Sequence, residues 1–180
     1  MKLDKIVLIS ILSIVIVVII TLSVFFVICS INNDNITYNG IVSYVRDNYE
    51  MLENFPYSEI EKIKLSNDNP EIKKHKEEET LKRYLGENTI VTSVYAYNEN
   101  ILQFYCGSSG FLDVGTYTGF YFSRDDMPYA FEFNNLELVE ISPGVFEGQD
   151  ENGAQQSHGG HRIRTEKIRD KWYYYIQYWY

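Results

Sequence analysis

The residue with the clearest capacity for chemistry is Cys106, which follows Tyr105 at the start of a segment rich in glycine and serine. A cysteine becomes a nucleophile when a nearby group lowers the pKa of its thiol, and the sequence offers His161 as the base. The alternative is that Cys106 shares the apolar side of a strand with Phe104 and is a small buried hydrophobic residue. We favour the second interpretation, because one cysteine and one histidine are a weak indication of catalysis.

Two histidines, His158 and His161, are close enough in sequence to bind one metal ion with Asp150 or Glu151. Metal ligands, however, usually lie on rigid elements that orient them, whereas this segment is rich in glycine. We therefore predict neither a metal site nor any other cofactor.

A second candidate group is the pair Asp125 and Asp126, since glycosidases use paired carboxylates. The pair is followed by Met127 and Pro128, and aspartate side chains commonly bond to their own backbone in turns. We interpret both aspartates as turn residues.

The strongest compositional signal is aromatic, because the chain contains 16 tyrosines and 10 phenylalanines and ends in WYYYIQYWY. Alternate side chains of a strand point to opposite faces, so Tyr173, Tyr175 and Trp179 share one face. Tyr105 and Tyr121 lie on that face too if their strands are neighbours. Aromatic rings with polar groups suit recognition, which makes these five the candidate binding residues. The open alternative is that helices cover this face, because tyrosine and tryptophan also favour strands for packing reasons.

In the first part of the region that positions these groups, the apolar residues recur at helical spacing. This spacing predicts a helix from residue 41 that ends before Pro56, and a second short helix capped by Ser58 with Glu61 in a capping box. A third helix begins at Pro70 and ends at Gly86. Its apolar residues lie mostly at its end, so its first half is expected to be in water.

From residue 89 the apolar pattern has a period of two, which indicates strands. Short turns between them predict antiparallel pairing of successive strands. The predicted strands are 89–97, 101–106, 119–123, 129–133, 136–141, 145–147 and two more around Arg164 and over 171–180. The fold class is therefore α+β, with two or three helices packed on an antiparallel β-meander sheet.

The N-terminus contains an apolar run over residues 6–31, preceded by Lys2 and Lys5. At ~1.5 Å rise per residue such a helix exceeds the ~30 Å hydrocarbon core of a bilayer. We predict a single-pass transmembrane anchor over residues 1–31, with the N-terminus in the cytoplasm because the basic flank precedes it. Cleavage as a signal peptide, or lipidation at Cys29, is the alternative.

Beyond a linker over residues 32–37, residues 38–180 are enough for one domain, which we place outside the cell. The net charge of the chain is −9, and nucleic-acid binding depends on Lys and Arg that displace counterions from phosphate. Nucleic acid is therefore excluded as a partner. The expected partners are the lipid bilayer, through residues 6–31, and a surface protein or a cell-wall component.

Several segments together resemble small membrane-anchored proteins of Gram-positive bacteria. They are 119–123, Asp126 with Pro128, 165–168 and 172–175. The resemblance implies a place in a bacterial cell membrane with the domain outside, and it implies no activity. We expect a non-enzymatic binding or accessory module, the alternative being a cysteine-dependent surface enzyme that uses Cys106 and His161.

Overall fold

The computed structural model describes residues 15–21, 37–111, 114–131, 136–150 and 160–179. Most of the predicted anchor and of the linker lies outside these ranges. Residues 15–21 are helical, and in the part of the chain that is described no helix has both the length and the apolar character to span a membrane.

Between residues 37 and 92, all of which the structure describes, three helices precede the sheet: α2 (Tyr38–Glu53), α3 (Tyr57–Leu65) and α4 (Pro70–Leu85). The predicted bounds of α4 are confirmed, because the helix begins at Pro70 and Gly86 ends it at φ 86°. Its N-cap is Asn69, which was not predicted and which accepts a hydrogen bond from the backbone of Ile72. Its buried residues all lie in its second half, as expected. The predicted cap of α3 is wrong, since the helix begins after Pro56 and Ser58 makes no capping bond.

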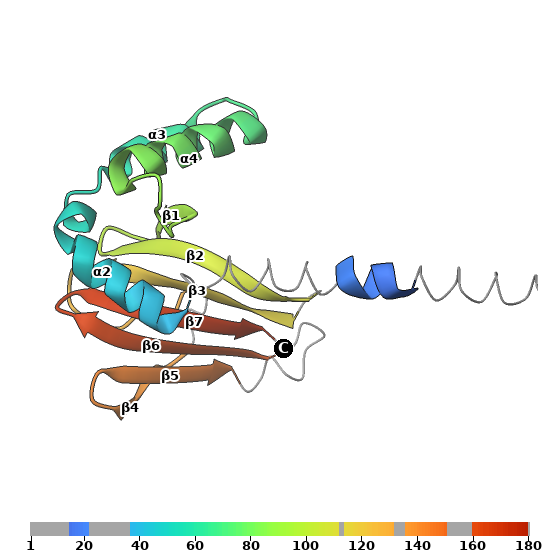
Figure 1. The fold of residues 1–180 in the computed structure, drawn as a ribbon. Coiled ribbons are helices and arrows are strands. Elements are labelled where there is room, and N and C mark those ends of the chain that lie inside the picture. Colours follow the sequence, from blue (N-terminus) through green and yellow to red (C-terminus); the bar gives the residue numbers. More distant parts are fainter. Residues whose placement is uncertain (1–14, 22–36, 112–113, 132–135, 151–159, 180) are drawn as a thin grey trace, which may run out of the picture.

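The sheet has seven antiparallel strands: β1 (Ser93–Ala96), β2 (Ile101–Phe111), β3 (Val114–Ser123), β4 (Val139–Ser142), β5 (Val145–Asp150), β6 (His161–Arg169) and β7 (Trp172–Trp179). Their order across the sheet is β1-β2-β3-β7-β6-β5-β4. The α+β class is therefore confirmed, while the single meander is wrong. Two meanders meet where β3 pairs with β7, and the chain crosses from β3 to β4 at the far edge (Figure 1).

The chain that makes this crossing, residues 124–138, is named the crossover segment. The sequence predicts a strand over 129–133, but the described part of that range, 129–131, has no strand. The alternation there places Phe131 against the sheet instead, where its side chain is fully buried. Apolar residues in the crossover segment therefore serve to cover the sheet and not to extend it.

The sheet separates two apolar layers. On the helix face, α2 lies across β3, β7 and β6, while α3 and α4 stand beside the β1 edge (Figure 1). The core there includes Ile41, Phe104, Phe120 and Trp172. On the opposite face, which we call the crossover face, Phe131 packs on the aromatic rings of β3 and β7. Both faces of the sheet centre are thus buried, by different parts of the chain.

Candidate binding site

Cys106 and His161 lie on opposite faces of the sheet. Cys106 belongs to the core of the helix face and its side chain is buried. Burial raises the pKa of the Cys106 thiol well above its usual value. His161 is on β6, where its ring meets that of Trp179 edge-on with centroids 3.9 Å apart, on the crossover face. The two side chains are not brought together, so the predicted alternative of a cysteine–histidine pair has no geometric support.

The candidate metal ligands are not assembled within the described residues. His158 lies outside those residues, and no group of three or more His, Cys, Asp or Glu side chains with metal-binding geometry occurs in the described ranges.

Asp126 is a turn residue, as predicted, but it also ties two turns together. Its φ of 54° places it in the left-handed region that aspartate tolerates. Its carboxylate accepts hydrogen bonds from Lys167 Nζ at 2.5 Å and from the Lys171 backbone at 2.8 Å, and its carbonyl accepts one from the Tyr173 hydroxyl at 2.7 Å. Asp125 is exposed beside it. Asp126 therefore has a structural role in this turn.

The five predicted binding rings do not form an open platform. Tyr121 and Tyr175 are fully buried and Tyr173 is 2% exposed, because the crossover segment packs over them. Phe131 lies 5.0 Å from the Tyr121 ring, centroid to centroid, in an edge-on contact. The expectation of an exposed face is wrong for these rings, and the element that covers them is a loop and not a helix.

The structure brings three of the five rings together, next to the part of the sheet that the crossover segment covers: Tyr105, Tyr175 and Trp179. They help to line a concavity of about 450 Å³ on the crossover face. We call it the tyrosine hollow, and its lining consists of Tyr95, Tyr97, Gln103, Tyr105, Tyr117, Tyr175, Gln177 and Trp179. Its volume falls within the ~300–1,000 Å³ that is typical of small-molecule sites.

The floor of the hollow exists because β3 has a glycine at its centre. Gly119 pairs with Tyr105 on β2 and with Tyr175 on β7. A Cβ atom at Gly119 would lie 2.8 Å from the Tyr175 hydroxyl and 2.2 Å from the Phe104 carbonyl oxygen. Only glycine therefore lets the Tyr175 ring lie across β3 towards β2.

Two amides lie in the hollow, Gln103 on β2 and Gln177 on β7, and each is 6% exposed. Among the described residues nothing accepts a hydrogen bond from Gln177 Nε2, and the Tyr175 hydroxyl likewise lacks a partner at hydrogen-bond distance. Burial raises the pKa of the Tyr175 phenol, and the nearby Gln103 amide offsets part of that effect. Buried polar groups are normally satisfied, and these two atoms lie together in one hollow.

The walls of the hollow are aromatic. The Tyr117 ring lies 6.2 Å from Tyr105 and 6.1 Å from Trp179, and its side chain is 42% exposed. On the opposite side Tyr97 forms the wall, and its ring packs on Phe131 of the crossover segment with a 5.0 Å separation of ring centroids. The rings thus surround the two amides and leave the hollow open outwards.

The sequence contains part of the signal for this site. Period-two alternation puts Gln103 with Tyr105, and Gln177 with Tyr175, on one face. It does not show that β3 pairs with β7, which is what makes Gln177 a neighbour of Tyr117. The roles of Tyr95, Tyr97, Tyr117 and Gly119 were missed for the same reason.

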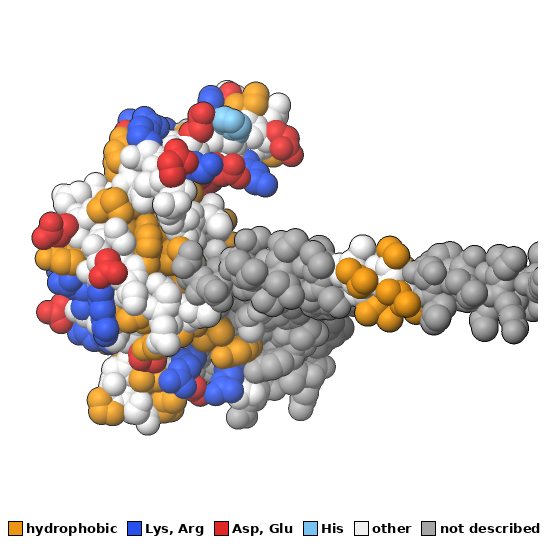
Figure 2. Space-filling model, viewed as in Figure 1, with side chains coloured by type: hydrophobic (Ala, Val, Ile, Leu, Met, Phe, Trp, Pro, Cys, Tyr) orange, Lys and Arg blue, Asp and Glu red, His pale blue; other side chains and the backbone are white. Residues whose placement is uncertain are grey.

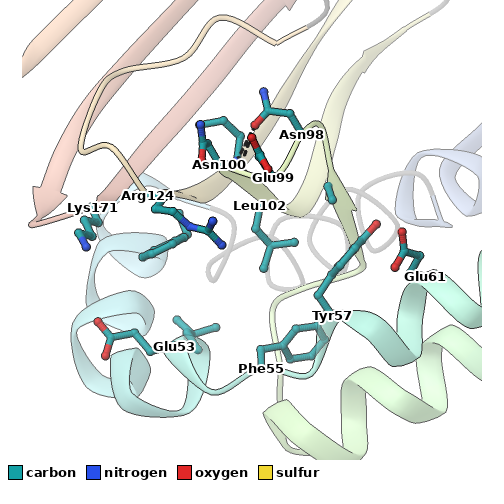
Figure 3. Close-up of a pocket in the computed structure, with 14 residues that line it drawn as sticks. Glu53, Phe55, Tyr57, Glu61, Asn98, Glu99, Asn100, Leu102, Arg124 and Lys171 are labelled. Carbon is teal, nitrogen blue, oxygen red and sulfur yellow. Dashed lines mark hydrogen bonds between the residues drawn. The ribbon is translucent and has the colours of Figure 1, made fainter.

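A larger hollow of about 810 Å³ lies between the end of α2, the start of α3 and the β1–β2 loop (Figure 3). Phe55 and Leu102 form part of its apolar floor, and its charged side chains are all exposed: Glu53, Glu61, Glu99, Arg124 and Lys171. No described residue that lines it has a buried polar atom without a partner. Exposed charges are satisfied by water, so this hollow gives a weaker indication of a ligand.

Comparisons of the chain with protein-family models, with curated proteins and with solved structures find no match.

Proposed function

We propose that this chain is a non-enzymatic binding module, anchored in a bacterial cell membrane by residues 6–31. In this proposal residues 38–180 lie outside the cell and hold a cell-wall component in the tyrosine hollow. The observation that carries the proposal is the combination of exposed aromatic walls with the buried Nε2 atom of Gln177, which has no hydrogen-bond partner in the described chain. The apolar run over 6–31 and the lysines before it support the membrane placement.

The buried state of Cys106 favours binding over catalysis. A nucleophilic cysteine needs access to its substrate and a populated thiolate, and burial opposes both. The aromatic hollow, in contrast, needs no reactive group to bind a ligand.

Cosedimentation of the full chain, in detergent micelles, with insoluble wall material from a Gram-positive bacterium tests the binding proposal. We expect the wild-type chain to sediment with the wall and Tyr117→Ala to sediment less, because the change removes an exposed wall of the hollow. Tyr49→Ala, on α2 and outside the hollow, is the matched control and should behave as wild type. Absence of cosedimentation, or equal retention of Tyr117→Ala, would reject the proposal.

Protease treatment of intact spheroplasts tests the placement. Loss of residues 38–180 with survival of the N-terminal segment is the expected result. Full protection of the domain would contradict the proposed orientation.

A further inference from the structure

The tyrosine hollow limits the charge of its ligand. All of its lining side chains are tyrosine, tryptophan or glutamine, although the chain as a whole has a net charge of −9. A charged group that entered the hollow would lose its hydration without meeting an opposite charge among the lining side chains. The Lys64 ammonium, 3.8 Å from the centroid of the Tyr95 ring, is already paired with Glu77. The part of the ligand that lies in the hollow is therefore uncharged.

The two amides also exclude a purely apolar ligand. Gln103 and Gln177 are both 6% exposed, and a hydrocarbon laid over them would remove their remaining access to water. A buried polar group without a partner costs about 1–3 kcal/mol. The ligand must therefore carry groups that can both donate and accept hydrogen bonds.

Gln177 is free to turn towards such a ligand. Its Nε2 atom has no acceptor among the described residues, so rotation of the terminal amide sacrifices no hydrogen bond of that atom. A hydroxyl group is the simplest partner, because it accepts from an amide nitrogen and donates to an amide or phenol oxygen.

The shape of the hollow favours a compact ring over an extended chain. A peptide that binds between aromatic rings lies in a groove open at both ends. Here the Tyr97 ring, in contact with Phe131 at a centroid separation of 5.0 Å, forms a wall on one side. The exposed Tyr117 ring offers a flat apolar surface on the opposite side, where the C–H face of a sugar ring can stack.

Resting on the binding function proposed above, we propose that the tyrosine hollow recognises a neutral saccharide. A sugar ring stacks on Tyr117 and Trp179, and its hydroxyl groups bond to Gln177 and Gln103.

Ligand-observed NMR titrations of the full chain in detergent micelles test this inference. The neutral probes are triacetylchitotriose, cellotriose and maltotriose, and the comparison probes are trigalacturonate, which is charged, and a proline-rich decapeptide. We expect at least one neutral trisaccharide to bind. Gln177→Leu should weaken that binding by about tenfold, the effect of one lost hydrogen bond. Gln149→Leu, at an exposed position on β5 outside the hollow, should leave binding unchanged.

The stability of Gln177→Leu keeps the result interpretable. The change removes a buried, unpartnered Nε2 atom, so the melting temperature should not fall. A variant that remains folded and still binds the trisaccharide with wild-type affinity overturns the inference.

Two other outcomes also overturn it. Preference for trigalacturonate or for the peptide would assign the hollow to a different ligand class. If no neutral trisaccharide binds while wall cosedimentation still depends on Tyr117, the binding function stands and the saccharide assignment is rejected.

Discussion

Glu77 on α4 and Lys64 on α3 approach to 3.6 Å and hold both backbone groups of Val94 on the outer edge of β1. The Glu77 carboxylate accepts from the Val94 N–H at 3.3 Å, and the Lys64 ammonium donates to the Val94 carbonyl. An open strand edge is a template for pairing with other chains. Helices α3 and α4, whose surface carries charges of both signs (Figure 2), thus close this edge of the sheet.

Glu77→Ala should lower the free energy of unfolding by about 1–3 kcal/mol, because the Val94 N–H and the Ser93 hydroxyl both lose their acceptor. It should also increase self-association, since the β1 edge becomes available. Urea denaturation and sedimentation velocity measure the two effects. Glu78→Ala, an exposed neighbour on α4, is the control, and equal losses in both variants would contradict the edge-closing role.

The ionised carboxylate of Asp126 should stabilise the fold at neutral pH, and this contribution should be lost in acid. Burial acts to raise the pKa of the Asp126 carboxyl, but hydrogen bonds from Lys167, the Lys171 backbone and Tyr173 outweigh it and hold the pKa below 3.8. A depressed pKa in the folded state contributes stability above the unfolded pKa, and that contribution is lost as the pH falls through the folded pKa.

Asp126→Asn should therefore be less stable than wild type at neutral pH, and the difference should vanish as the pH falls below the depressed pKa. The neutral-pH difference is about 1 kcal/mol, because water screens this partly exposed pair. Denaturant titrations at a series of pH values measure it, with Asp125→Asn as the control. A difference that persists unchanged to the lowest pH would show that ionisation is not the cause.

Two buried tyrosine hydroxyls should respond differently to removal. The Tyr121 hydroxyl lies 2.8 Å from Thr165 Oγ1 and accepts from the Tyr129 backbone at 2.9 Å, so Tyr121→Phe should cost about 1–3 kcal/mol. Tyr175→Phe removes a hydroxyl that lies near the Gln103 amide but makes no hydrogen bond of normal geometry in the described chain, so it should cost less than about 1 kcal/mol. Thermal and urea denaturation compare the two variants directly. Equal losses would mean that the Tyr175 hydroxyl is satisfied within the fold.

The thiol of Cys106 should react slowly in the folded protein. In a Cys29→Ser background at neutral pH, labelling by a thiol reagent should be at least about 100-fold slower than in urea-unfolded chain, since burial raises the thiol pKa and blocks access. His161→Ala should not change the rate, because His161 is on the other face. Rapid labelling of the native chain, slowed by His161→Ala, would restore the cysteine–histidine hypothesis.

Local signals account for the parts of the fold that were predicted well. Asn69, Pro70 and Gly86 fix the ends of α4 through a cap, a restricted φ and a positive φ, all of which act within a few residues. The alternation around Phe104 likewise places Cys106 in the apolar core. Such features depend on neighbours in sequence, so the sequence alone is sufficient to find them.

The crossover segment shows where prediction from the local sequence pattern fails. The alternation of Tyr129 and Phe131 resembles a strand, and the same spacing serves equally well to press apolar rings onto a sheet that already exists. Propensity cannot separate the two cases, because what decides is whether a neighbouring strand with a free edge is present.

The sequence by itself determined the α+β class, the bounds of α4, the inert environment of Cys106 and the identity of the aromatic face. Only the tertiary structure decided that β3 pairs with β7 and that the crossover segment buries Tyr121 and Tyr173. It also decided that the Gln177 side chain lines a hollow, which depends on Gly119. The physical reason is that the strand order, and the segments that cover each face of the sheet, depend on contacts between residues far apart in the chain. Alternation says which side chains share a face, and only pairing says which of them touch.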